Sequence, residues 1–193
     1  MAAALGTRDL GLLINNAGFG LYGLFADTAI DRELAMIDLN VRVPTELSKR
    51  LLPAIIRAGG GIINVASTAA FQPGPWMAVY YATKAYVLSL TESLSEELQG
   101  TGVTVTALCP GITATSMLDQ AQAASAELGG LPSMVIGSAE QVADEGFQAC
   151  LKGEVIRVPG VLNRAATLAG RATPRWLLRR VSGAMVRRLK GKG

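Results

Sequence analysis

The regular alternation of short apolar runs with longer helical patterns constrains the fold of this chain more than any other feature. The predicted strands are 10–15, 62–66, 103–108 and 155–158. The first two are almost wholly apolar, as is typical of strands buried on both faces of a parallel sheet. The predicted helices between the strands are 28–56, 76–98 and 138–151. This order predicts an α/β fold in which helices cover the faces of a parallel sheet.

Local signals set the expected helix boundaries. Thr28, followed by Asp31, is typical of an N-cap with an acidic residue in the first turn. Ser138 and Gln141 fit a capping box at the start of a later helix. The glycines at 59–61 are expected to end the first helix.

Length and composition indicate one compact domain. The chain has 193 residues, of which 50% are hydrophobic, and this is enough for one buried core. No apolar run is long enough to span a bilayer, and the N-terminus lacks the pattern of a secretory signal. We therefore expect a cytoplasmic location.

Histidine is absent and only two cysteines occur. The absence of histidine excludes Ser-His-Asp and Cys-His nucleophilic sites and imidazole-based zinc sites. We expect no metal, and acid–base chemistry must use Tyr, Lys, Asp or Glu. Cys109 and Cys150 are far apart and lie in apolar segments, which favours buried, reduced thiols over a disulfide.

Charge is unevenly distributed along the chain. Residues 1–151 contain 7 Lys/Arg and 14 Asp/Glu, a net charge of −7, whereas residues 152–193 contain 11 and 1, a net charge of +10. Such charge suits anionic lipid, nucleic acid or an acidic protein, and it is also compatible with a solvated helix face. In 176–190, basic and apolar residues recur at helical spacing. We expect weak membrane contact or docking on a second subunit at most, and no nucleic acid.

A glycine motif follows the first predicted strand. Gly18, Gly20 and Gly23 match the G-x-G-x-x-G dinucleotide fingerprint. In that motif a helix begins within the glycine run and points its N-terminus at a pyrophosphate. Here the helix is expected to begin only near Thr28, and the acidic residue at the fingerprint's distance, Asp38, lies inside it. We therefore interpret 18–23 as an irregular loop that needs positive φ angles.

Four polar residues suggest proton chemistry. Tyr80 and Lys84 are four residues apart in a predicted helix, so their side chains share one face. A nearby ammonium lowers the pKa of a phenol, which lets a tyrosine exchange protons near neutral pH. Ser67 follows the second strand, where its hydroxyl could bind a substrate oxygen. Asn40 lies in mid-helix, an unusual position for a short amide unless it simply faces solvent.

Five motifs, in this order, resemble those of the classical short-chain dehydrogenases/reductases. They are NNAG at 15–18, LNV around Asn40, a strand ending in Ser67, YYATK at 80–84 and PGITAT at 110–115. The resemblance implies a partial Rossmann-like fold over 1–160, a doubly wound parallel sheet that lacks the first strands. Residues 161–193 would form a basic helical extension of the same domain, similar to that of a bacterial subgroup.

The resemblance also implies catalytic roles. Tyr80 would be the general acid/base, and Lys84 would lower its pKa and hold the nicotinamide ribose. Ser67 would orient the substrate carbonyl or alcohol. Asn40 would hold a water that relays protons to Lys84. Tyr81 has an alanine, Ala85, four residues later, so Tyr80 is the better candidate for the catalytic phenol.

The implied cofactor is NAD or NADP, and both Tyr80 and Lys84 would contact it. Beside its adenosine half, the strand end would be shaped by Asn15, Ala17 and Gly18. The nicotinamide pocket would be bounded by Pro110, Gly111 and Thr115.

One part of the family pattern does not occur before Asn15, namely the T-G-x-x-x-G-I-G loop that grips the cofactor phosphates. We therefore expect a fragment or a mis-started product, roughly 70 residues short at about 30 residues per βαβ unit. A genuine short protein completed by a partner chain is the alternative. In either case the strand at 10–15 becomes an exposed apolar edge.

The resulting hypothesis is an NAD(P)-dependent oxidoreductase for a small carbonyl or alcohol, homo-oligomeric when full length. An apolar carbonyl compound is favoured because large apolar residues are expected to line the substrate site: Phe71, Trp76, Met77, Met117 and Leu118. The alternative is a catalytically silent fragment that serves, if at all, in binding or scaffolding.

Overall fold

Four parallel strands form one sheet in the computed structural model, which describes residues 8–113, 137–174, 176–180 and 183–184. Within these residues the strand order is β1-β2-β3-β4. The strands are β1 (Leu12–Asn15), β2 (Gly61–Val65), β3 (Thr104–Leu108) and β4 (Ile156–Arg157). The register pairs Ile14 with Ile63, and Ile63 with Thr106. The predicted parallel α/β fold is confirmed.

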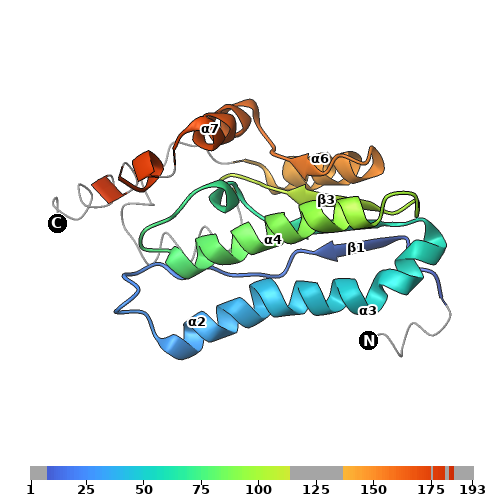
Figure 1. Ribbon diagram of the computed structural model, residues 1–193, viewed down its shortest axis with the longest axis horizontal. Helices are drawn as coiled ribbons and strands as arrows, with labels where there is room; N and C mark the ends of the chain where they lie inside the picture. Colours follow the sequence, from blue (N-terminus) through green and yellow to red (C-terminus); the bar gives the residue numbers. More distant parts are fainter. Residues whose placement is uncertain (1–7, 114–136, 175, 181–182, 185–193) are drawn as a thin grey trace.

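Helices cover both faces of this sheet (Figure 1). The three that pack directly on it are α3 (Val43–Ala58), α4 (Ala78–Glu97) and α6 (Ala139–Leu151). Ile62 packs with Leu51 of α3 and with Leu98 at the end of α4, whereas the next residue, Ile63, packs with Cys150 of α6. Since successive strand residues point to opposite faces, α3 and α4 lie on one face and α6 on the other. The doubly wound arrangement is thus present.

The first long helix differs from its prediction in two ways. It comprises α2 (Ile30–Ile37), the π-helical turn η1 (Asp38–Arg42) and α3. The predicted N-cap at Thr28 is wrong: Ala29 precedes the first turn, and the Thr28 hydroxyl donates to the Phe25 carbonyl instead (3.4 Å). The π turn contains Asn40, and such turns are frequent at functional sites. At the other end Gly59 adopts a left-handed conformation (φ 55°), as expected of a glycine helix stop.

Among the described residues, the first strand is not buried on both faces, as its apolar pattern suggests, but forms the exposed apolar edge that we also expected. Leu13 is buried beneath α3, but its neighbour Ile14 is 54% exposed. The physical reason is the position of α6, which packs on β2 and β3. Among the described residues β1 is an edge strand (Figure 1), so Ile14 lies on the α6 face without a helix above it.

The later boundaries agree more closely with the sequence patterns. Ser138 caps α6, and its hydroxyl accepts from the Gln141 N–H (3.5 Å). After β4, the helix α7 (Val161–Ala172) ends shortly before Pro174 and packs against the 3-10 turn η2 (Thr68–Phe71). Both cysteines are buried and free. No described helix is both long and apolar enough to cross a membrane.

Candidate active site

The loops that follow β2 and β3 are joined at the carboxyl edge of the sheet. The Ala66 N–H donates to the Leu108 carbonyl (2.8 Å), and the Thr68 N–H donates to the Pro110 carbonyl (2.9 Å). Ser67 lies between these bonds, and its hydroxyl donates to the Pro110 carbonyl at 3.5 Å. The same hydroxyl accepts from the Ala69 N–H (3.1 Å) and caps η2. Ser67 is therefore fixed beside Pro110 and Gly111 at the carboxyl edge of the sheet, which is the edge where parallel sheets bind ligands.

The first two turns of α4 bring Tyr80 and Lys84 to this rim. The Lys84 ammonium lies 5.8 Å from the centroid of the Tyr80 ring. It also donates to the Val65 carbonyl at the end of β2 (2.8 Å). The Ser67 hydroxyl lies near enough to the Tyr80 phenol to lower the pKa of that phenol. Three residues predicted to form one site are therefore brought together from the loop after β2 and from α4.

The loop after β1 covers the two α4 side chains closely. A Cβ added to Gly20 would lie 3.1 Å from the Tyr80 ring. One added to Gly18 would lie 2.9 Å from the Asn40 amide oxygen and 3.6 Å from the Lys84 ammonium. Neither glycine has a positive φ, so the predicted reason for them is wrong at these two positions. They are needed because the backbone approaches side chains that leave no room for a Cβ. The next helix begins only at Ile30, so the glycine run does not form a phosphate cradle at a helix N-terminus.

Asn40 holds this loop in place. Its amide oxygen accepts from the Phe19 N–H (3.2 Å), and its amide nitrogen donates to the Phe19 carbonyl (2.9 Å). The nitrogen also donates to the Thr83 hydroxyl (3.1 Å), and Asn40 is only 2% exposed. The solvent-facing interpretation is therefore wrong, because the π turn directs the amide inward. The water relay implied by the family resemblance stays a prediction.

A second amide network, not predicted from the sequence, supports the end of β1. Asn15 and Asn64 are paired in the sheet register, and the Asn15 amide donates to the Asn64 side-chain oxygen (2.8 Å) and to the Ser48 hydroxyl (3.1 Å). Asn64 in turn donates to Thr91 of α4 (2.9 Å). The available signal was Asn64 itself, a polar residue inside an apolar strand. Among the described residues, the Asn15 side-chain oxygen is buried without a hydrogen-bond partner.

The electrostatics of Tyr80 differ from the prediction. Burial raises the pKa of its phenol, and the Ser67 hydroxyl opposes this rise only in part. We expected Lys84 to lower the pKa of Tyr80. In this structure the ammonium is bound to the Val65 carbonyl instead, and desolvation of the phenolate dominates. The phenol is therefore protonated at neutral pH.

Lys84 is perturbed in the opposite sense. Burial lowers the pKa of its ammonium to about 8, because desolvation penalises the charged form. Among the described residues, the Lys84 ammonium donates one hydrogen bond, to the Val65 carbonyl. An ammonium can donate three. Two N–H groups are thus left for a ligand.

Replacing Lys84 by methionine is expected to raise the free energy of unfolding at pH 7 by about 1–3 kcal/mol, although Lys84 is a predicted catalytic residue. Below pH 8 the lysine is charged in both folded and unfolded states, so the folded state bears the full desolvation penalty. Between about pH 8 and its ordinary pKa of 10.5, the folded state releases the proton first and the penalty disappears. Urea unfolding at pH 7 and pH 10 measures both effects.

The control for this prediction is Lys49→Met, at an exposed position of α3. Its effect should stay within about 0.5 kcal/mol at both pH values. A Lys84→Met protein that is less stable than the parent at pH 7, by the same amount as at pH 10, would contradict the assigned desolvation.

The expected substrate-side residues lie around the same rim but make different contacts. Met77 packs against Gly20, and the Trp76 ring contacts Tyr22 at a centroid distance of 5.3 Å. Phe71 ends η2, beneath the guanidinium of Arg171 in α7 (5.7 Å).

Three predicted positions, Thr115, Met117 and Leu118, lie outside the described residues. Of the remaining cofactor candidates, Ala17 is exposed at the rim, and Gly111 is covered by Asn163 of α7, which would lie 2.6 Å from an added Cβ. No group of three or more possible metal ligands occurs in the part of the chain that the structure describes.

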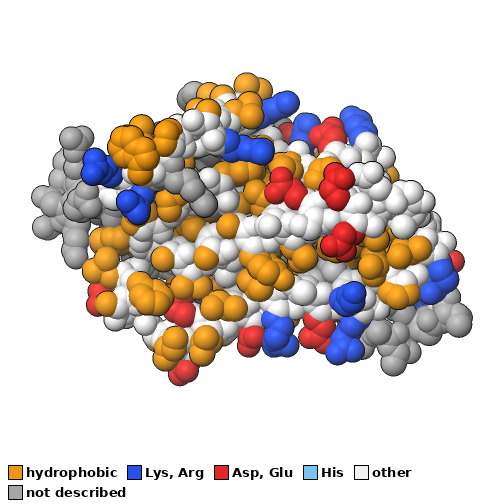
Figure 2. All heavy atoms as spheres, viewed as in Figure 1, with side chains coloured by type: hydrophobic (Ala, Val, Ile, Leu, Met, Phe, Trp, Pro, Cys, Tyr) orange, Lys and Arg blue, Asp and Glu red, His pale blue; other side chains and the backbone are white. Residues whose placement is uncertain are grey.

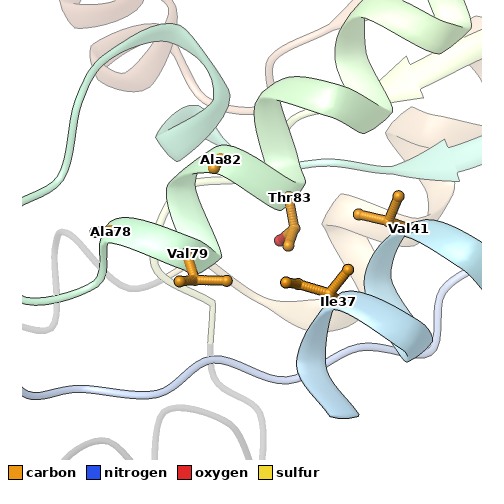
Figure 3. Close-up of a pocket in the computed structure, with 6 residues that line it drawn as sticks. All are labelled: Ile37, Val41, Ala78, Val79, Ala82 and Thr83. Carbon is orange, nitrogen blue, oxygen red and sulfur yellow. The ribbon is translucent and has the colours of Figure 1, made fainter. Parts of the chain in front are cut away.

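An apolar groove adjoins the site on the outer side of α4. It is lined by Ile37, Val41, Ala78, Val79, Ala82 and Thr83, as Figure 3 shows. None of these side chains is ionisable, so the groove cannot perform proton transfer. It is a surface between α2 and α4 and not the reacting site.

Comparisons with known proteins agree with this geometry. The family model described as short chain dehydrogenase matches residues 2–126. Among curated relatives, the ketoacyl reductase HetN of Nostoc sp. is 34% identical over 122 residues, which cover 62% of this chain and 42% of that protein. The chain spans less than half the length of the first curated relatives that it matches.

Solved structures are similar over most of the chain. A short-chain dehydrogenase from Sphingobium yanoikuyae in complex with NADPH has a TM-score of 0.72 and 29% identity, over 88% of this chain and 67% of that chain. One from Burkholderia cenocepacia in complex with NADP has a TM-score of 0.76 and 27% identity, over 93% and 73%.

Proposed function

Because this chain belongs to the short chain dehydrogenase family, we propose that it serves in hydride transfer between NAD or NADP and a carbonyl or alcohol substrate. The observation that carries the proposal is the meeting of Ser67, Tyr80 and Lys84 at the carboxyl edge of the sheet. A hydroxyl, a phenol and an ammonium together can orient a substrate oxygen and exchange a proton with it.

In carbonyl reduction, Tyr80 donates its proton to the substrate oxygen while Ser67 holds that oxygen in place. The raised pKa of Tyr80 suits this direction, since the phenol keeps its proton at neutral pH. Alcohol oxidation requires the phenolate as proton acceptor and is therefore favoured at alkaline pH. Below about pH 8, where Lys84 is still charged, its ammonium stabilises the negative charge that develops on the phenol during carbonyl reduction.

The bound cofactor supplies or accepts the hydride. Lys84 has hydrogen-bond donors left for ribose hydroxyls, and Asn15 lies at the end of β1. Ala17 and Gly18 lie on the same loop, and Pro110 lies across the rim. The complexes of the similar structures with NADPH and NADP support a nicotinamide dinucleotide as the cofactor.

The proposal also covers the class of substrate, the oligomeric state and the cellular location of the protein. Phe71 and Met77 beside the site favour an apolar carbonyl compound. We also propose a cytoplasmic homo-oligomer. Two exposed apolar side chains of α2 support subunit contact: Ile30, and Ile37, which lines the groove in Figure 3.

Fluorescence titration of the full chain with NADH and NADPH, followed by turnover with apolar aldehydes and ketones, tests the function. Micromolar binding and consumption of the reduced cofactor are expected. A chain that binds neither nucleotide would instead favour the alternative, a catalytically silent binding protein.

Replacing Ser67 by alanine is expected to lower kcat by about 10²-fold, because the substrate oxygen loses a preorganised donor. Ser93→Ala, an exposed serine on α4, is the matched control and should leave kcat unchanged. Equal kcat values for the Ser67→Ala protein and the parent would remove Ser67 from the proposed site.

A further inference from the structure

The helix α7 presents its apolar side to solvent, the reverse of an ordinary surface helix. Thr167 is its buried residue, and Asn163 and Gly170 flank Thr167 on the inward side. The opposite side is formed by exposed side chains at helical spacing: Val161 (85%), Leu162 (73%), Ala165, Leu168 (58%) and Ala172. Small and polar residues thus hold α7 on the protein, while the large apolar ones are left without a partner among the described residues.

Cationic side chains border this apolar face. Arg164 and Arg171 are exposed and seven residues apart, so they lie along one flank of the helix, two turns from each other. Beyond Pro174, the helical turn at 176–180 exposes Trp176 (55%) together with Arg179 and Arg180. Figure 2 shows orange apolar side chains over α7 and the following turn, with blue Lys and Arg side chains beside them.

We infer that α7 and the turn at 176–180 form a docking surface for an anionic lipid bilayer. Leucine, valine and tryptophan enter the headgroup boundary while arginines at the flank bind lipid phosphates. The positive charge of this part of the chain favours an anionic bilayer over a second copy of the chain. Residues 152–193 carry 11 Lys/Arg against 1 Asp/Glu, so two copies meeting through this face would bring like charges together, whereas an anionic membrane neutralises them.

The arrangement also has a spatial consequence. α7 packs on η2, the turn that follows Ser67, and Asn163 lies against Gly111. A bilayer at α7 would therefore lie beside the candidate site. The surface itself does not depend on the proposed oxidoreductase activity, so the two can be tested separately.

Flotation of the full chain with lipid vesicles tests the inference. Vesicles of phosphatidylcholine with about one third phosphatidylglycerol are expected to bind the protein at low salt, and binding should fall at high salt. The double variant Val161→Ser/Leu168→Ser should bind about tenfold less or weaker still. The control Leu34→Ser, at a 53% exposed position of α2, should bind as the parent does.

Three outcomes would overturn the inference. The first is no binding to anionic vesicles at low salt, and the second is equal binding to pure phosphatidylcholine. The third is a dimer in light scattering that the double variant, but not Leu34→Ser, converts to monomer, since the face would then bind a second copy. Circular dichroism of each variant confirms that the exposed substitutions leave the fold intact.

Discussion

Replacing Tyr80 by phenylalanine is expected to lower kcat for NAD(P)H-dependent carbonyl reduction by about 10²–10⁴-fold. The substitution removes only the phenolic oxygen. The ring still packs beneath Gly20 and beside Lys84, so stability and nucleotide affinity should change little. Steady-state turnover at neutral pH, followed by cofactor absorbance, measures the loss.

Tyr81→Phe provides the matched control on the same helix. Both phenols have a pKa raised by burial, but only Tyr80 has Ser67 within reach. The Tyr81 ring instead packs against Gly74. Its kcat should remain within about twofold of the parent, well below the effect of losing a general acid. Similar losses in both variants would show that the phenol of Tyr80 has no special role.

Replacing Asn40 by alanine should have the largest effect on stability among the site variants. It leaves the Phe19 N–H and carbonyl without their partner, whereas the Thr83 hydroxyl keeps its bond to the Tyr80 carbonyl. Each buried polar group left unpaired costs about 1–3 kcal/mol, so we expect a loss of about 2–4 kcal/mol in the free energy of unfolding. Activity should fall as well, because this amide holds the loop over Lys84 and Tyr80.

Asn16→Ala is the control for this substitution, since Asn16 is exposed on the same loop. Urea unfolding should show a change within about 0.5 kcal/mol for Asn16→Ala. An Asn40→Ala protein as stable as its parent would mean that the amide clamp contributes nothing to holding the loop.

The sheet and much of the site could be predicted because they depend on local patterns. Apolar runs, and glycines that end helices, predicted the boundaries of β2, β3 and α4 to within a few residues of the observed ones. The parallel order then placed Ser67 at the carboxyl edge. The spacing of Tyr80 and Lys84 put both on one helix face, and the structure brings all three together.

The burial of individual side chains and the pKa of Tyr80 depend on which elements pack against each other, and no local sequence pattern encodes this packing. Ile14 is exposed because α6 lies over β2 and β3, although its run of residues suggests a strand buried on both faces. Asn40 is buried because a π turn redirects it toward Phe19. The pKa of Tyr80 is raised because burial outweighs the lowering effect of the Ser67 hydroxyl. Each outcome is set by tertiary contacts.

The central claim is that this site transfers a hydride while Tyr80 transfers a proton, and isotope labelling tests it most directly. The full chain would be incubated with an apolar ketone and NADPH or NADH in which both hydrogens at the reactive nicotinamide carbon are deuterium, and the product analysed by mass spectrometry. The account predicts an alcohol with one deuterium on the carbinol carbon, formed by the parent and lost with Tyr80→Phe. Product without deuterium, or equal labelling by the Tyr80→Phe protein, would contradict it.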